Sequence, residues 1–564
     1  MPDPILLPRP RRTNFRHDAR AGNGPLSVEI DPAVSHPHGY RLRLDAHGPT
    51  AWAADATGIF YAQQTLTQLR RQFGDQLPQG EIEDWPDYAV RGVMLDISRD
   101  KVPTMATLFM LVDLFAELKI NQFQLYTEHT FAYSKHEEVW RHASPMTAGE
   151  IRELDHYCRN RHIDLVPNQN SFGHMERWLK HERYKPLAEA PDGFDFPWGV
   201  RHPGPFSLNP RDSRSLELIE GLYNELLPNF ASKMFNVGCD ETFDLGVGRS
   251  KAECDRRGKE RVYLDFILKI YEAVKRRGRT MQFWGDIILH KPELIPELPK
   301  DIIALNWGYE ANHPFEKETR AFADAGVPFY VCPGTSSWCS IAGRTQNALE
   351  NLRNSAACGL AHGASGYLNT DWGDLGHLQY LPISFLGFAA GAAYSWCLES
   401  NRDIDLTPAL DTHIFQDSAH VSGRLIWDFG NVYQAAKTPV GNASRFFWSL
   451  LDDPQRSKNW ECLTKEEFDD AEARVSDVVA GLDRARMNRA DASLITSEIR
   501  NAAAMLLYTC RHGRWRMHQE SASADELLAQ RQLIVAEHRR LWLARNRSGG
   551  LEDSCQRLSR PITR

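Results

Sequence analysis

The sequence predicts an α/β protein built around a (β/α)8 TIM barrel, with a small N-terminal α/β domain and a helical C-terminal domain. The chain has 564 residues, which exceeds one ordinary domain. From residue 91, short apolar runs alternate with segments of helical periodicity, as in βα units around a parallel sheet. Beyond about residue 401 the strand signals fade and helical periodicity continues alone.

The N-terminal domain is predicted at residues 1–88. It begins with a polar leader, over residues 1–20, that is rich in Pro and Arg. Segments 27–29, 40–44 and 51–53 read as short strands, and 59–73 has the apolar spacing of an amphipathic helix. The unit ends near residue 86.

The barrel is predicted at residues 89–400 because eight apolar runs of strand length occur there. These candidate strands are 92–97, 122–126, 163–168, 234–238, 280–284, 302–306, 328–332 and 366–368. Helical periodicity lies between them at 104–118, 147–160, 216–227, 261–277, 317–325 and 341–358. Eight strands with crossovers make a barrel whose chemistry lies at the C-terminal strand ends.

The C-terminal domain is predicted at residues 401–564. Its helical periodicity is clearest at 497–510 and 524–543, and 549–564 reads as a loose tail. Trp396, inside an apolar helix-like run, is expected in the core.

Composition excludes several classes of function. The net charge is -8 and the basic residues are scattered, so a nucleic-acid partner is not expected. The 10 cysteines form no CxxC pair and no cluster with zinc spacing, so we expect buried free thiols, no metal and no cofactor. The first 20 residues lack the apolar core of a secretory signal, and no apolar run reaches membrane-spanning length. We therefore expect a cytoplasmic protein with no membrane partner.

Polar and aromatic residues follow each predicted barrel strand. A mouth with carboxylates, one Arg, one His and four Trp suits an uncharged, hydroxyl-rich ligand that has one apolar face. No P-loop, GxGxxG, GxSxG or HExxH motif offers another chemistry. In strand order, these residues are Asp96 and Arg99; Tyr126 and Glu128; Asn168, Asn170 and His174; Asp240 and Glu241; Trp284 and Asp286; Trp307; Trp338; and Asp371, Trp372 and Asp374.

The adjacent pair Asp240-Glu241 follows the fourth strand. Successive strand side chains alternate in direction, so one carboxylate can serve a leaving oxygen and the other a neighbouring group. Glycosidic cleavage needs an acid with a raised pKa and a negative partner for the developing oxocarbenium ion. We expect Glu241 to be the acid, tuned by Asp96, Glu128 and His174.

Three segments carry a family resemblance. Residues 91–99, RGVMLDISR, resemble the RGxxLDxSR opening of the barrel in glycoside hydrolase family 20, the β-N-acetylhexosaminidases. Residues 58–66, GIFYAQQTL, are similar to the family's GxxYAxQTL helix, and 236–241, NVGCDE, to its HxGGDE strand. The resemblance covers about residues 39–398 and implies a divergent, intracellular-type member that removes terminal GlcNAc or GalNAc units.

The resemblance also implies roles. Glu241 would be the general acid/base, and Asp240 would orient the substrate's own acetamide as it attacks the anomeric carbon, giving an oxazoline and net retention. Arg99 and Asp374 would hold ring hydroxyls, while His174 with Glu128 would form a relay behind Glu241. Asp286 is a further substrate-binding candidate, and the sugar would be walled by Trp284, Trp307, Trp338 and Trp372.

The sequence departs from the family pattern at several points. Asn236 and Cys239 replace the commoner His and Gly. The Tyr-x-Asp that usually follows strand seven is missing, and residues 335–338, TSSW, stand there. The resemblance therefore leaves the donor to the acetamide oxygen unassigned.

Other interpretations stay open. Arg99 is also an ion-pair candidate for Asp96. Another barrel glycosidase with a carboxylate nucleophile would accept substrates without a 2-acetamido group. A metal-dependent barrel lyase would hold a divalent cation with Asp96, Glu128, Asp240 and Glu241, and would lose activity with chelator. A sugar-binding protein would show no turnover. A homodimer through the C-terminal helices is also compatible with the sequence.

Overall fold

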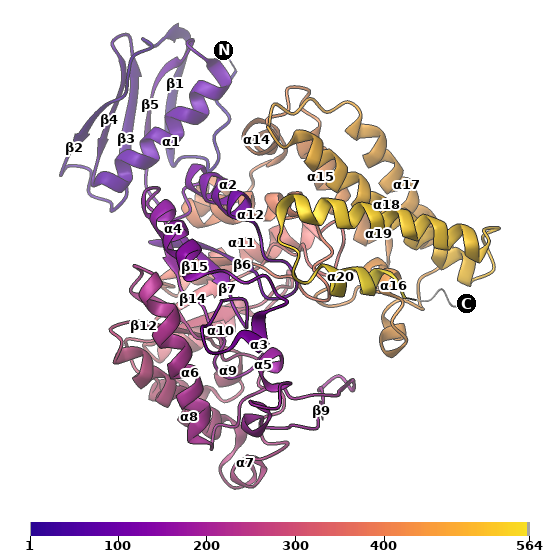
Figure 1. The fold of residues 1–564 in the computed structure, drawn as a ribbon. Coiled ribbons are helices and arrows are strands. Elements are labelled where there is room, and N and C mark those ends of the chain that lie inside the picture. Colours follow the sequence, from indigo (N-terminus) through magenta and orange to yellow (C-terminus); the bar gives the residue numbers. More distant parts are fainter. Residues whose placement is uncertain (1, 561–564) are drawn as a thin grey trace.

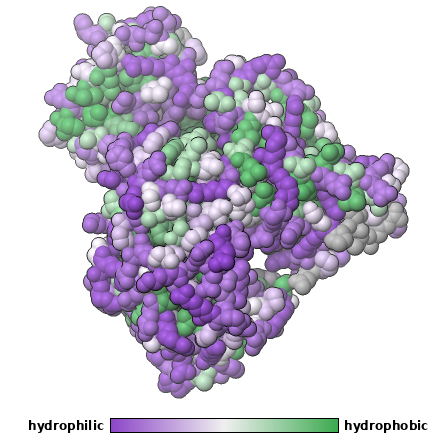
Figure 2. All heavy atoms as spheres, in the orientation of Figure 1, coloured by the Kyte–Doolittle hydropathy of each residue, from purple (hydrophilic) through white to green (hydrophobic). Residues whose placement is uncertain are grey.

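The computed structural model describes residues 2–560 and has three parts (Figure 1). A mixed N-terminal sheet is followed by an eight-stranded parallel barrel with its helices, and then by a helical C-terminal region. The predicted fold class is confirmed. The face of the molecule in Figure 2 is mostly hydrophilic. Within residues 2–560 no helix is long and apolar enough to cross a membrane.

The N-terminal part is a five-stranded sheet in the order β1-β5-β3-β4-β2, covered by helix α1. The Asp55 side chain caps α1 by accepting from the Gly58 amide. The prediction of a polar leader is wrong over β1, which pairs antiparallel with β5. Residue 1 lies outside the described residues. The elements are β1 (Arg12–Arg20), β2 (Ser27–Ile30), β3 (Tyr40–Asp45), β4 (Gly48–Ala53), α1 (Ala56–Phe73) and β5 (Pro78–Asp84).

The barrel contains all eight predicted strands, with ends shifted by a few residues. It closes between β8 and β11, where the Asn236 amide donates to the Pro167 carbonyl at 3.0 Å. The strands are β6 (Val90–Asp96), β7 (Gln122–Tyr126), β8 (Asp164–Val166), β11 (Met234–Asn236), β12 (Thr280–Trp284), β13 (Ile303–Trp307), β14 (Phe329–Cys332) and β15 (Gly366–Asp371).

Helices surround the barrel, and the six predicted there are confirmed. Thr147 and Glu150 form a capping box that fixes the start of α4. The long helices are α2 (Met105–Glu117), α4 (Ala148–Arg159), α6 (Ser213–Leu226), α8 (Lys259–Lys275), α10 (Phe315–Asp324), α11 (Thr345–Ala361) and α12 (Leu381–Trp396). Loop elements are α3 (Glu137–Trp140), α5 (Glu176–Leu179), β9 (Phe194–Asp195), β10 (Arg201–His202), α7 (Lys251–Arg257), α9 (Asp286–Leu289) and the 3-10 helix η3 (Pro292–Glu297).

The C-terminal region is helical, as predicted, and its buried side chains form one continuous core with those of the barrel. The loose tail predicted at 549–564 is wrong over α20, where Leu551, Cys555 and Leu558 are buried on one helical face. Residues 561–564 lie outside the described residues. The helices are α13 (Leu398–Asn401), α14 (Thr407–Ala409), α15 (Ser422–Phe429), α16 (Arg445–Leu451), α17 (Lys465–Leu482), α18 (Ala492–Arg516), α19 (Ala524–Arg545) and α20 (Leu551–Leu558).

Asp84 joins the N-terminal sheet to the barrel helices. Its carboxylate accepts from Tyr40 Oη at 2.8 Å and from Lys119 Nζ at 3.0 Å. Trp396 Nε1, at the end of α12, donates to it at 2.9 Å. Trp396 is fully buried, as predicted. These bonds satisfy a carboxylate that would otherwise be costly to bury.

The cysteines are free thiols, as predicted, and all of them except Cys462 are buried. The nine buried thiols therefore contribute to packing.

Candidate active site

A pocket with a cavity volume of about 120 Å³ opens at the C-terminal ends of the barrel strands. It brings together residues predicted from five separate strand ends. It also includes two residues that the sequence did not single out, Tyr309 and Asn442. Its lining consists of Arg99, Asp240, Glu241, Trp284, Trp307, Tyr309, Trp372, Asp374 and Asn442.

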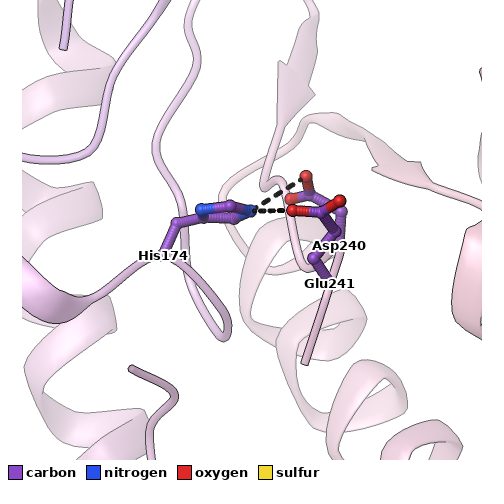
Figure 3. A group of neighbouring side chains, drawn as sticks. All are labelled: His174, Asp240 and Glu241. Atoms are coloured by element: carbon purple, nitrogen blue, oxygen red, sulfur yellow. Dashed lines mark ion pairs between the residues drawn. The ribbon is translucent and has the colours of Figure 1, made fainter. Parts of the chain in front are cut away.

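Asp240 and Glu241 direct their carboxylates at one histidine (Figure 3). His174 Nε2 lies 3.3 Å from Asp240 Oδ2 and 3.4 Å from Glu241 Oε2. The expectation that the two side chains diverge as on a strand is wrong, because β11 already ends at Asn236. Both acids lie on the loop that follows, where the alternation of strand side chains does not apply.

The backbone of this loop is strained. Cys239 and Glu241 have φ values of 73° and 48°, in the left-handed region that non-glycine residues rarely adopt. Gly173 lets the preceding barrel loop approach, since a Cβ there would lie 2.3 Å from the Asp240 carbonyl oxygen. Strain of this kind is retained where the surrounding structure fixes a functional geometry.

His174 is held as a cation between the acids. Burial lowers its pKa, but Asp240 and Glu241 outweigh burial and raise the pKa well above its ordinary value. The ring of Phe206 packs edge-on against the imidazole, with centroids 4.9 Å apart. The protonated His174 therefore gives Asp240 and Glu241 a counter-charge that is fixed in position and partly desolvated.

Arg99 is fixed by carboxylates and rings on several sides. It lies 3.1 Å from Asp96 and 3.2 Å from Asp374, and its guanidinium carbon is 4.9 Å from the Trp372 ring centroid. Burial lowers the pKa of Arg99, but Tyr126 and the surrounding carboxylates raise it well above its ordinary value. The ion pair with Asp96 and the place in the pocket thus occur together. Burial raises the pKa of Asp374, although Arg99 opposes this.

Asp96 connects the loops after the first and last strands. One oxygen accepts from the Ser98 and Arg99 amides, and the other accepts from the Gly373 amide at 3.0 Å. These bonds give Asp96 a positioning role at the base of the Arg99 side chain.

Glu128 lies behind Arg99 and accepts from Tyr126 Oη at 3.0 Å. Burial raises its pKa, and Arg99 opposes this.

Among residues 2–560, the group of potential metal ligands that converges is His174, Asp240 and Glu241. The four-carboxylate arrangement of the lyase alternative, which includes Asp96 and Glu128, is therefore not formed.

Of the four predicted tryptophans, three line the pocket and Trp338 does not. Trp338 is 1% exposed because its ring packs edge-on against Tyr309, with centroids 5.0 Å apart. Its Nε1 donates to Asn442 Oδ1 at 3.0 Å. Trp338 therefore supports two lining residues from behind.

Asp286 also lies outside the lining of the pocket. Its Oδ2 accepts from the Glu241 amide at 3.0 Å. Burial, followed by the charge of Asp240, raises its pKa to about 8. Asp286 thus supports the backbone of the loop that carries Asp240 and Glu241, and its raised pKa favours the neutral acid at pH 7.

Tyr309 comes two residues after β13 ends at Trp307. Its oxygen accepts from Trp372 Nε1 at 2.8 Å, and burial raises its pKa well above the ordinary value. The phenol therefore stays protonated at neutral pH. Its place directly after a strand end was a signal that the sequence offered.

Asn442 reaches the pocket from the C-terminal region. It lies just before α16, and its backbone N–H donates to Glu310 Oε1 at 2.7 Å. Its own φ is 54°. It follows no barrel strand and belongs to none of the three motifs.

Comparison with protein families gives two matches. The catalytic domain of glycosyl hydrolase family 20 matches residues 88–357, and domain 2 of the same family matches residues 8–85. Together they cover more than half of the chain.

Individual relatives are more distant. A beta-hexosaminidase of Akkermansia muciniphila is 27% identical over 312 residues, covering 50% of this chain and 61% of the relative. Hexosaminidase D of Bos taurus is 26% identical over 235 residues, covering 40% of this chain and 64% of the relative. The alignments thus span less than two thirds of either relative.

Solved structures share the fold. A GH20 exo beta-N-acetylglucosaminidase from Vibrio harveyi, in complex with N-acetylglucosamine, has a TM-score of 0.58 at 17% identity, covering 76% of this chain and 78% of that one. The Flavobacterium johnsoniae chitobiase has a TM-score of 0.58 at 17% identity, covering 94% and 95%. With both family domains matched in order, and with the Asp240-Glu241 pair at the barrel mouth, the chain belongs to glycoside hydrolase family 20.

Proposed function

We propose that the protein is an exo-acting, retaining β-N-acetylhexosaminidase that removes terminal GlcNAc or GalNAc units by substrate-assisted catalysis. The observation that carries the proposal is the Asp240–His174–Glu241 group at the edge of a small tryptophan-walled pocket. Trp284, Trp307 and Trp372 offer apolar faces, while Arg99 and Asp374 offer groups for ring hydroxyls.

Glu241 protonates the leaving oxygen and then activates water. Its side chain is 33% exposed, so it can reach both the glycosidic oxygen and solvent. Asp240 is almost buried and accepts the acetamide N–H, which turns the carbonyl oxygen toward the anomeric carbon. Carboxylates outnumber Arg99 and His174 around the pocket, and this favours the positive charge that develops on the sugar.

Tyr309 supplies the missing donor to the acetamide oxygen. Its oxygen accepts from Trp372 and also meets the Thr370 side chain, so donation to the acetamide oxygen would replace the Thr370 contact. It lies close enough to Asp240 for that charge to act on its pKa. Asp240 and Tyr309 would thus hold the N–H and the carbonyl oxygen of one acetamide.

A carboxylate nucleophile is the alternative mechanism. The facing oxygens of Asp240 and Glu241 lie within 4.8 Å of each other, so a plain β-glucoside, which lacks the acetamide, distinguishes the two mechanisms.

The test is release of 4-nitrophenol from the β-GlcNAc, β-GalNAc and plain β-glucosides. We expect turnover of the acetamido sugars alone, and a fall in kcat of roughly 10²- to 10⁴-fold in both Glu241→Gln and Asp240→Asn. Equal turnover of the plain glucoside would contradict the substrate-assisted mechanism. Dependence of activity on a divalent cation would favour the lyase alternative, and binding without product would leave a sugar-binding protein.

A further inference from the structure

A hairpin formed by β9 and β10 projects from the barrel (Figure 1). Strands β9 and β10 pair antiparallel, and the turn between them carries Phe196 and Trp198. The two rings stack, with centroids 4.4 Å apart and planes within 10°. Trp198 is nevertheless 45% exposed, and within residues 2–560 it is the aromatic member of the exposed large hydrophobic side chains. A stacked but exposed indole leaves one broad face open to solvent.

The hairpin is tied to the catalytic acid through Phe243. The Phe243 ring packs edge-on against both Phe196 and Trp198, with centroids 5.3 Å away in each case. Phe243 lies two residues after Glu241, and its amide donates to the Glu241 carbonyl at 2.6 Å. Phe243, which packs against the aromatic platform of Phe196 and Trp198, therefore belongs to the same loop as Glu241.

The second connection runs through the histidine. Phe206, which follows β10, packs against His174, and its ring centroid lies 6.2 Å from those of Phe196 and Phe243. An unbroken run of aromatic rings thus leads from the His174–Glu241 contact out to the exposed Trp198.

We propose that the open face of Trp198, backed by Phe196 and Phe243, binds the sugar unit that leaves. The inference rests on the proposed function, because a general acid must face the leaving oxygen and Glu241 adjoins this platform. In the proposed function the tryptophans around the pocket hold the terminal sugar, so a further aromatic face on the side of Glu241 fits the next ring of the chain.

Charge on the hairpin indicates a neutral sugar. The paired strands β9 and β10 carry two charged side chains, Arg201 and Asp195, and these lie 3.6 Å apart and pair with each other. Platforms for anionic glycans keep a cation available for the ligand. The structure therefore assigns the subsite to an uncharged pyranose, such as the reducing-side residue of a β-linked N-acetylhexosamine oligosaccharide.

The test compares two leaving groups. One substrate is the β-linked GlcNAc disaccharide, and the other is GlcNAc β-fluoride, whose leaving atom cannot reach the hairpin. In Trp198→Ala we expect kcat/KM for the disaccharide to fall by roughly three- to tenfold, with the fluoride unchanged. Trp198→Phe keeps an aromatic face and should retain most of the disaccharide activity. Trp52→Ala, in the N-terminal sheet, is the matched control.

Two results would overturn the subsite: an equal fall on both substrates, or no fall on the disaccharide. A change in elution volume on size exclusion, with unchanged kinetics, would assign Trp198 to contact between two copies of the chain instead. If the wild type hydrolyses neither substrate, the proposed function fails. Calorimetry with the GlcNAc trisaccharide then decides the platform, since weaker binding by Trp198→Ala supports it and equal binding excludes it.

Discussion

Trp372 Nε1 donates a hydrogen bond to Tyr309 Oη at 2.8 Å, so a residue after the last barrel strand orients a phenol after the sixth. We expect Tyr309→Phe to lower kcat for the 4-nitrophenyl β-GlcNAc glycoside by roughly 10²-fold, because one donor to a developing charge is removed from a desolvated site. Steady-state kinetics measure this. Tyr330→Phe, buried in β14 away from the pocket, is the control. Unchanged kcat in Tyr309→Phe would remove the phenol from the mechanism.

The cation at His174 sets the pH range of activity. Asp240 and Glu241, 3.3 and 3.4 Å from its Nε2, raise the pKa of His174 well above the ordinary value, so the charge is lost only at high pH. His174→Gln removes this titrating group, so kcat/KM should fall, and the decline of the wild-type pH–kcat/KM profile at high pH that follows loss of the charge should be absent. The exposed His290→Gln should leave the profile in place. A lower kcat with an unmoved profile would make His174 a packing residue only.

Asp286 should make the fold less stable as pH rises. Its pKa in the folded protein, about 8, exceeds the ordinary value of 3.8, so between these values the folded state holds a proton that the unfolded chain has released. Stability therefore falls as pH rises through this window. Asp286→Asn keeps an acceptor for the Glu241 amide without titrating, so its Tm should fall less between pH 5 and pH 9. Parallel melting curves for the two proteins would contradict the assignment.

Lys119 should be important for attachment of the N-terminal sheet. Its ammonium and Asp84 are both buried, 3.0 Å apart. Lys119→Met leaves the carboxylate without its counter-charge and should lower the free energy of unfolding by about 3–5 kcal/mol. Arg43→Met breaks the exposed pair with Glu81 in the same sheet and should cost less than about 1 kcal/mol. Urea denaturation followed by tryptophan fluorescence compares them, and equal losses would exclude a special role for the buried pair.

The sequence predicted the barrel well because parallel strands are buried on both faces and read as continuous apolar runs. It missed β1, RTNFRHDAR, since that strand is mostly exposed and shows no apolar alternation. It missed α20 because a helix of 8 residues buries only one short stripe, Leu551, Cys555 and Leu558. Elements that bury little leave little pattern.

The candidate site was predictable where its residues follow strands, as Arg99, Asp240 and Trp372 do. Trp338 also follows a strand, but which way a loop turns its side chain depends on tertiary packing against Tyr309. Asn442 lies in the helical C-terminal region, where no strand ends mark the residues that face the pocket, so the sequence could not predict its place there. The cytoplasmic location, the homodimer and the domain boundaries at 88 and 400 stay predictions.

Asn442 places one wall of the pocket outside the barrel, and this bears on how the enzyme can be cut or recombined. The match to the family's catalytic domain ends at residue 357, before β15, Trp372, Asp374 and Asn442. A fragment trimmed to that match would lose the last barrel strand, β15, together with these three lining residues of the pocket. The shortest fragment that contains the whole pocket therefore extends at least to Asn442, in the C-terminal helical region. The segment between α12 and α16 contains Asn442, so insertions there would change the shape of the pocket and would not simply lengthen a linker between domains.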